Sequence, residues 1–236
     1  MNIKKHIPNL ITLLNLFCGC IALVFASELN FEMAFYFVCL GIFLDFFDGF
    51  FARLFQVSSP LGLQLDSLAD MVTSGVVPGF VMFHLLQQSQ NPLSDNLILP
   101  YLGFIITLGS CYRLANFNID TRQTDSFIGL PTPANTLFIV SLPLVLKYSY
   151  SLMVFEIVSN SWVLLAITLF SAYILNAEIP LFSLKIKDFT FQKNALQIVF
   201  LALSALLLVF FQYLGIPFII ITYILVSVIN NNFMRK

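Results

Sequence analysis

Eight apolar stretches set the strongest limit on what this chain can fold into. Each is close to the ~20 residues that an α-helix needs to cross the hydrocarbon core of a bilayer. Because lipid offers no hydrogen bonds, a spanning backbone must satisfy its own polar groups, and a helix does so. We therefore expect an all-α, polytopic membrane protein with both termini on one side. The expected spans are residues 7–26, 33–54, 63–86, 97–117, 132–149, 159–177, 194–213 and 215–231.

The composition excludes an ordinary soluble domain. Of 236 residues, 59% are hydrophobic and only 10% are charged. The net charge of −1 gives no basis for nucleic-acid binding. We expect one integral membrane domain over residues 1–236, in which residues 33–86 form a helical hairpin. The part of the chain over residues 136–236 carries no pattern from which a role can be read.

The basic residues predict the orientation. If the first span starts inside, Lys147 alone among the 11 Lys and Arg residues falls outside. Cytoplasmic loops carry the excess of Lys and Arg, so this side is expected to be cytoplasmic. The basic residues on it are Lys4, Lys5, Arg53, Arg113, Arg122, Lys185, Lys187, Lys193, Arg235 and Lys236.

Four carboxylates interrupt the second and third apolar stretches. Asp45 and Asp48 precede a short connector, residues 54–61, and Asp66 and Asp70 follow it. In two antiparallel helices, the i,i+3 and i,i+4 spacings place each pair on one face, at matching depths. Four unpaired negative charges would repel one another in a low dielectric. Hard divalent cations relieve that repulsion and prefer oxygen ligands, so the sequence predicts a metal site.

Two glycines and an arginine accompany the carboxylates. Gly49 and Gly62 leave room for a ligand close to the backbone. Arg53, at the expected membrane edge, supplies a planar cation suited to phosphate. Together these residues indicate phosphoryl chemistry at a membrane surface.

The spacing D-x2-D-G-x2-A-R-x8-G-x3-D-x3-D over residues 45–70 resembles the signature of the CDP-alcohol phosphotransferase (phosphatidyltransferase) family at every fixed position. The resemblance implies two divalent cations, Mg²⁺ or Mn²⁺, with Ca²⁺ left open. It implies that Asp45 and Asp66 bridge both ions and that Asp48 completes the first. Asp70 would complete the second and accept a proton. The residues implied to bind the CDP-lipid are Asn9, Thr12, Gly49, Ala52, Arg53, Ser59 and Gly62.

Three shorter stretches resemble the phosphatidylserine synthase branch of that family. They are I-P-N-L-I-T-L-L-N-L-F-C-G from residue 7, R-L-A-x-F-N from residue 113 and G-L-P-x-P from residue 129. The resemblance implies CDP-diacylglycerol as donor, L-serine as acceptor and CMP as product, in the bacterial cytoplasmic (inner) membrane with the site facing the cytoplasm. The residues expected near the acceptor are Arg113, Asn116, Asn118, Gly129 and Pro131.

Two alternatives stay open at this point. The first is the same chemistry with another acceptor, such as glycerol phosphate or an inositol. A phosphorylated acceptor would call for several extra cationic residues, and only Arg53, Arg113 and Arg122 are candidates. A divalent-cation transporter would show inverted repeats and a site at mid-membrane, and the chain contains no second Asp-rich hairpin. The oligomeric state, a homodimer included, is not readable from the sequence.

Overall fold

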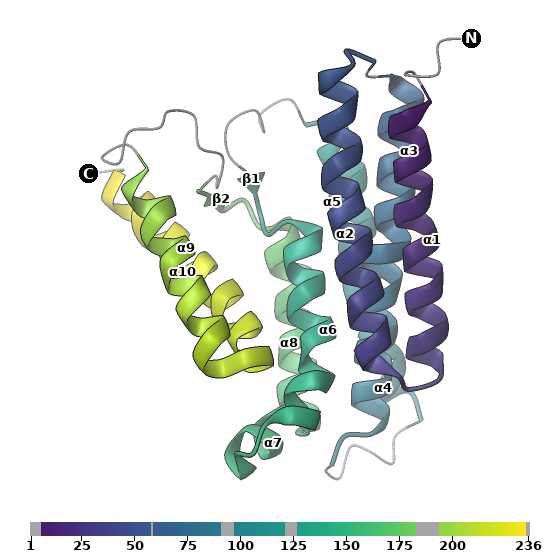
Figure 1. Ribbon diagram of the computed structural model, residues 1–236. Helices are drawn as coiled ribbons and strands as arrows, with labels where there is room; N and C mark the ends of the chain where they lie inside the picture. The colour runs from purple at the N-terminus through teal and green to yellow at the C-terminus, as the bar shows by residue number, and fades with distance from the viewer. Residues whose placement is uncertain (1–5, 58, 91–96, 121–126, 183–193, 235–236) are drawn as a thin grey trace.

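The computed structural model of the protein is built almost entirely of helices (Figure 1). It describes residues 6–57, 59–90, 97–120, 127–182 and 194–234. The all-α prediction is confirmed, because the strands in the described residues are two pieces of two residues each.

Each predicted apolar stretch forms a helix or a run of consecutive helical segments. The third stretch is interrupted by a π-helical turn, η2, and the fourth begins as a 3₁₀ helix, η3. The elements of the first half are α1 (Ile7–Ser27), α2 (Phe31–Leu54), α3 (Pro60–Asp70), η2 (Met71–Val76), α4 (Val77–Gln87), η3 (Leu99–Phe104) and α5 (Ile105–Phe117).

The second half adds two features that the apolar pattern did not predict, a short helix α7 and a pair of two-residue strands. The elements are β1 (Phe127–Ile128), α6 (Thr132–Tyr148), α7 (Leu152–Val158), α8 (Ser161–Asn176), β2 (Pro180–Leu181), α9 (Ala195–Phe211), η5 (Gln212–Leu214) and α10 (Gly215–Met234).

Within the described residues, four helical segments are long and apolar enough to cross a membrane, judged by length and composition. The protein is therefore an integral membrane protein. In Figure 1, α1 begins and α10 ends at the same end of the molecule. The four segments are Ile7–Ser27, Phe31–Leu54, Pro60–Gln87 and Ala195–Asn231.

The packed core lies between α1, α2, α4, α6 and α8. Its largest fully buried side chains include Met82, Leu86, Ile139 and Leu164. By contrast, α9 is largely exposed, and Phe200 is its one buried residue. Figure 1 shows α9 and α10 as a hairpin tilted against the other helices.

The strand pair ties the entry of α6 to the exit of α8. β1 and β2 pair antiparallel, with Phe127 opposite Leu181. Gly129, just after β1, has a φ of 76° and donates its N–H to Ile179 O at 2.9 Å. A glycine fits this left-handed backbone without steric cost. The segment leading into α6 is thus held against the chain that follows α8.

A polar cluster joins helices at the far end of α2, away from the four carboxylates. Lys147 Nζ lies 2.6 Å from Glu32 Oε2, and the Tyr148 hydroxyl donates to the same oxygen at 2.8 Å. The ring of Tyr148 stacks on that of Tyr213, with centroids 5.1 Å apart. The turn between α9 and α10 is anchored to α6 by this stacking.

The close approach of η3 to α4 gives a stability prediction. A Cβ at Gly103 would lie 2.6 Å from Phe83 N and 2.9 Å from Met82 C, which are backbone atoms that cannot rotate away. Gly103→Ala should therefore destabilise the fold by about 1–3 kcal/mol, as overpacking does. The measurement is the melting temperature of the detergent-solubilised protein.

Gly49→Ala is the matched control, because its added Cβ would meet nothing closer than Arg53 Nη1 at 3.5 Å. Alanine is favoured over glycine inside a helix by roughly 0.5–1 kcal/mol, so this variant should melt no lower than the wild type. Equal melting of the Gly103→Ala variant and the wild type would contradict the close packing of η3 on α4.

Candidate active site

The structure brings three of the four predicted carboxylates into one cluster. Asp45 and Asp48, from α2, and Asp66, from α3, each offer an oxygen, and these oxygens lie within 4.8 Å of one another. Among the described residues, no Lys or Arg forms an ion pair with them. The convergence of the two helices, predicted from spacing alone, is therefore present for these three residues.

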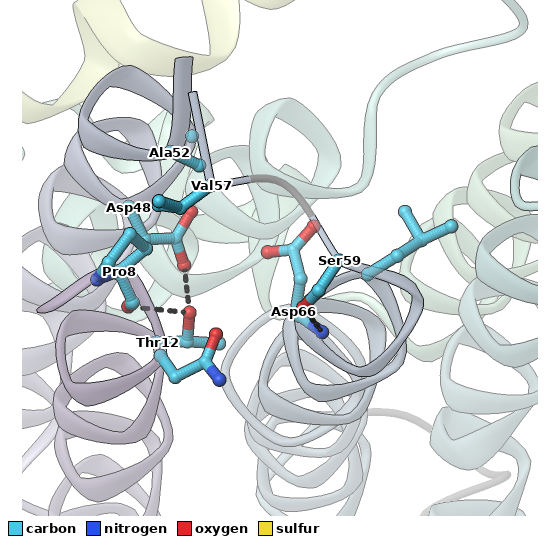
Figure 2. A pocket seen from close by; sticks show the side chains of 11 residues that line it. Pro8, Thr12, Asp48, Ala52, Val57, Ser59 and Asp66 are labelled. Carbon is cyan, nitrogen blue, oxygen red and sulfur yellow. Dashed lines mark hydrogen bonds between the residues drawn. The ribbon is translucent and has the colours of Figure 1, made fainter. Parts of the chain in front are cut away.

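Helix α1 supplies hydrogen-bond donors to two of the carboxylates. Thr12 Oγ1 lies 2.5 Å from Asp48 Oδ2 and 3.1 Å from Pro8 O, and its single proton serves one of them at a time (Figure 2). Asn15 Nδ2 donates to Asp70 Oδ1 at 3.1 Å, and Asn15 is fully buried. Asp70 is thus held beside the cluster by α1.

Asn15 is a site residue that the sequence reasoning missed. A signal was present, because Asn9, Thr12 and Asn15 recur every three residues inside an otherwise apolar helix. That spacing places polar side chains along one helix face. The face is the one that α1 turns toward α2 and α3.

The carboxylate cluster fits a divalent cation. Asp66 Oδ1 is buried and has no hydrogen-bond partner among the described residues. A buried, unpaired carboxylate oxygen is costly unless a cation or a donor reaches it. Three carboxylates in one place form the hard-oxygen ligand set that Mg²⁺ and Mn²⁺ prefer. Asp45, Asp48 and Asp66 are thus the residues placed to hold an ion, with Asp70 next to them.

A pocket of about 180 Å³ opens beside the cluster, between α1, α2 and the start of α3. Figure 2 shows the carboxylates of Asp48 and Asp66 facing each other across it. Six of the seven residues predicted to bind the CDP-lipid line this pocket. They are Asn9, Thr12, Gly49, Ala52, Ser59 and Gly62.

Local sequence shapes the α3 side of this pocket. Ser59 caps α3, its hydroxyl accepting from Gly62 N at 3.0 Å, and Pro60 occupies the first turn, where no N–H is needed. The helix therefore begins before the predicted residue 63. A Cβ at Gly62 would lie 3.2 Å from Asn9 Oδ1, so the missing side chain lets α1 approach α3.

Arg53 lies beside this pocket but is not among the residues that line it. Its side chain is exposed, and its guanidinium lies over Gly49, as Nη1 would be 3.5 Å from a Cβ placed there. The structure thus places a cation next to the glycine that follows Asp48, and among the described residues this cation has no ion-pair partner.

A second pocket of about 220 Å³ adjoins the same carboxylates. Asp66 lines both pockets, whereas Asp48 lines only the first. The residues that line the second pocket are Asp45, Asp66, Ser67, Asp70, Arg113, Leu114, Phe117, Pro131, Thr132 and Pro133.

Arg113 is the basic residue of the second pocket, and it also has a structural task. It is buried, and its Nη1 donates at 2.7 Å to both Ile128 O and Leu175 O. Gly129 packs against it, since a Cβ there would lie 2.9 Å from Arg113 Nη1. One guanidinium nitrogen therefore holds β1 and the end of α8 together beside the pocket.

The two asparagines predicted near the acceptor do not line this pocket. Asn116 is exposed. Asn118 Nδ2 donates to Ser67 Oγ at 2.8 Å, and its buried Oδ1 has no partner among the described residues. Of the predicted acceptor residues, Arg113 and Pro131 therefore lie at the pocket, and Gly129 contacts Arg113.

Comparisons with known proteins identify relatives of this chain. The family model described as CDP-alcohol phosphatidyltransferase matches residues 5–174. A Bacillus subtilis (strain 168) protein named CDP-diacylglycerol–serine O-phosphatidyltransferase is 34% identical over 151 residues, which are 62% of this chain and 78% of that protein.

Proteins of the same name in Helicobacter pylori (strain J99) and Saccharomyces cerevisiae are 34% and 33% identical. Their matched regions cover 56% and 58% of this chain, but only 55% and 53% of the relatives' own length. The predicted family membership is confirmed: the chain belongs to the CDP-alcohol phosphatidyltransferase family.

Proposed function

We propose that this protein transfers the phosphatidyl group of CDP-diacylglycerol to L-serine, giving phosphatidylserine and CMP. The observation that carries the proposal is the position of Asp66 at the junction of two pockets. One pocket is lined by six of the seven residues expected to bind the nucleotide lipid, and the other by Arg113 and Asp70. Relatives with 33–34% identity bear the name of this activity.

The first pocket is the proposed donor site. Asn9 and Thr12 form its α1 wall, where they would lie against the nucleotide. Gly49 and Gly62 lack side chains that would crowd the diphosphate, and Arg53 lies next to Gly49 as its cationic partner. The acyl chains would extend into the bilayer alongside the apolar helices.

The second pocket is the proposed acceptor site. Its one basic side chain among the described residues, Arg113, is matched to a single carboxylate such as that of serine. A phosphorylated acceptor would need more positive charge than this lining offers. Pro131 and Thr132, at the start of α6, form part of the wall around the acceptor.

Asp70 is the proposed proton acceptor. The serine hydroxyl would attack the phosphorus that carries diacylglycerol, the bond from that phosphorus to CMP would break, and the hydroxyl proton would pass to Asp70. A hydroxyl ionises far above neutral pH, so it needs a base within hydrogen-bond reach. Asn15 occupies Asp70 Oδ1 and leaves Oδ2 for this task.

Two divalent cations, Mg²⁺ or Mn²⁺, are proposed as cofactors, with Asp45, Asp48, Asp66 and Asp70 as the residues that would hold them. Bound there, they would polarise the diphosphate and stabilise the negative charge on departing CMP. This chain's own residues then bind the two substrates, orient them and accept the proton.

We also propose eight spans, with both termini and the active site on the cytoplasmic side. Arg53 and Arg113 lie at the carboxylate end, and Lys147 lies at the opposite end of α2, beside Glu32. The other basic residues lie outside the described part of the chain. This distribution follows the positive-inside rule and gives the site access to cytoplasmic serine.

The carboxylates provide the first functional test. Replacing Asp45, Asp48 or Asp66 by Asn removes a charged ligand at nearly constant size. CMP release from CDP-diacylglycerol and serine should fall by at least ~10²-fold, since even changes outside the ligand set cost 10–100-fold. The assay uses purified protein with a series of Mn²⁺ concentrations, and glycerol 3-phosphate and inositol serve as rival acceptors.

Glu32→Gln is the matched control, because Glu32 is a carboxylate at the other end of α2. It should keep normal turnover. Full activity of any of the three Asp variants at saturating Mn²⁺ would remove that residue from the proposed ligand set. Transfer to inositol but not to serine would show that inositol, and not serine, is the acceptor.

The two arginines should separate the two pockets. Arg113→Lys keeps the charge but loses the forked donor set, so the KM for serine should rise about tenfold or more while the KM for CDP-diacylglycerol changes little. Arg53→Lys should show the reverse pattern. If Arg113→Lys raised the KM for the lipid alone, Arg113 would belong to the donor site.

Cysteine labelling tests the orientation. In a variant without the four native cysteines, single cysteines at Glu28 or Gln88 should react with an impermeant maleimide added to intact cells. A cysteine at Leu54, at the carboxylate end, should react only after the membrane is opened. Labelling of residue 54 from outside would reverse the proposed orientation.

A further inference from the structure

The third apolar segment changes its helical geometry immediately after Asp70 in the chain. Residues Met71–Val76 form a π-helical turn, in which Val77 N–H donates to Val72 O, five residues back. Single π-turns inside α-helices are often found at functional sites. Here the turn starts at the residue after the proposed proton acceptor.

Pro78 explains why the segment cannot continue as a regular α-helix. Position 78 would donate its N–H to the carbonyl of Ser74, but proline has no N–H and its ring crowds that carbonyl. Ser74 is fully buried, so its carbonyl cannot reach water. A buried carbonyl without a donor costs about 1–3 kcal/mol.

Hydroxyl groups from two other helices reach the carbonyls of this turn. Thr136 Oγ1, from α6, lies 2.9 Å from Ser74 O and 2.8 Å from Thr132 O of its own helix, and its single proton serves one of them at a time. Ser110 Oγ, from α5, lies 3.5 Å from Ser74 O. Thr107 Oγ1, also from α5, donates to Gly75 O at 2.9 Å. The carbonyl to which residue 78 cannot donate an N–H thus has two hydroxyl groups within 3.5 Å across the helix interface.

The same turn is linked to Asp70 through α1. Thr73 Oγ1 donates to Asn15 O at 3.2 Å, and Asn15 Nδ2 donates to Asp70 Oδ1. A residue added to one helical turn rotates the segments on either side by about 100° relative to each other. The π-turn therefore determines which way Asp70 faces relative to the core-packed α4.

We propose that Thr136 is a positioning residue for Asp70, acting through the Ser74 carbonyl and the π-turn. Its hydroxyl holds the turn in the form that points the Asp70 carboxylate at the Asp45–Asp66 cluster. Thr107 acts in the same way on Gly75. This inference rests on the proposed metal site, because it predicts how firmly Asp70 serves that site.

The test compares Thr136→Val, which is nearly isosteric and lacks the hydroxyl, with Thr136→Ser, which retains it. Mn²⁺ affinity of the solubilised protein is measured by electron paramagnetic resonance, alongside kcat and both KM values. Thr136→Val should weaken Mn²⁺ binding about tenfold, the lower end of what supporting residues cost. It should lower kcat with little change in either KM, and Thr136→Ser should restore both values.

Thr168→Val is the matched control. Thr168 is as deeply buried as Thr136, and its hydroxyl also lies within 2.8 Å of the carbonyl four residues back, Leu164 O. Unlike Thr136, it donates to no carbonyl of another helix among the described residues. It should leave Mn²⁺ affinity and kcat unchanged. Should Thr136→Val not fold, Thr107→Val carries the same expectation.

Pro78→Ala tests whether Thr136 acts on Asp70 through the Ser74 carbonyl. It restores an N–H for the Ser74 carbonyl, so Thr136→Val should cost less in that background than in the wild type. Additive effects of the two substitutions would overturn the proposed route.

Three outcomes separate this inference from the proposed function. A fall in melting temperature without a change in Mn²⁺ affinity or kcat would make Thr136 a purely structural residue and overturn the inference. A Thr136→Val protein with wild-type Mn²⁺ affinity, kcat and melting temperature would overturn the inference as well. If wild-type protein bound no Mn²⁺, or bound it equally well as Asp45→Asn, the metal site itself would fail.

Discussion

Carboxylates are buried among apolar helices, and in the described part of the chain no basic residue forms an ion pair with them. The rest of the structure depends on this constraint. Charges in such surroundings persist only where donors or cations compensate them. Thr12 and Asn15 provide donors to Asp48 and Asp70. Asp66 Oδ1 has no donor among the described residues. The protein thus leaves one part of the cluster uncompensated, and that part lies where the two pockets meet.

The carboxylate cluster was the part of the site most open to prediction from sequence. Spacings of three and four residues fix a helix face locally, so Asp45, Asp48 and Asp66 needed only an antiparallel arrangement to converge. The role of α1 was harder to predict. That Asn15 meets Asp70, 55 residues later, depends on how α1 packs between α2 and α3. Polar residues at every third position indicate a polar helix face, but they do not show which residue that face will contact.

The backbone of the third apolar segment, which comprises α3, η2 and α4, was also only partly predictable from the sequence. Pro78 predicts that an intrahelical hydrogen bond is lost near Ser74. It does not predict that the segment adopts a π-turn, nor that Thr136, 62 residues further along, lies within hydrogen-bond distance of the freed carbonyl. Membrane helices accept such interruptions where neighbouring helices, Ser or Thr side chains, ordered waters or local changes of helical geometry satisfy the freed groups. The local sequence therefore shows which hydrogen bond is missing, and the packing of α5 and α6 determines which groups replace it.

Arg113 joins the two halves of the chain. From the sequence, Arg113 was predicted to contact the acceptor, and no role could be predicted for the later helices. In the structure its Nη1 binds the carbonyls of Ile128 and Leu175, so the end of α8 helps to fix the wall of the second pocket. Because two carbonyls already hold one nitrogen, the guanidinium cannot swing freely in the pocket. A rigid fork loses less entropy on binding a carboxylate than a flexible cation does. The later helices therefore contribute to the proposed acceptor site by restraining the group that would recognise the acceptor.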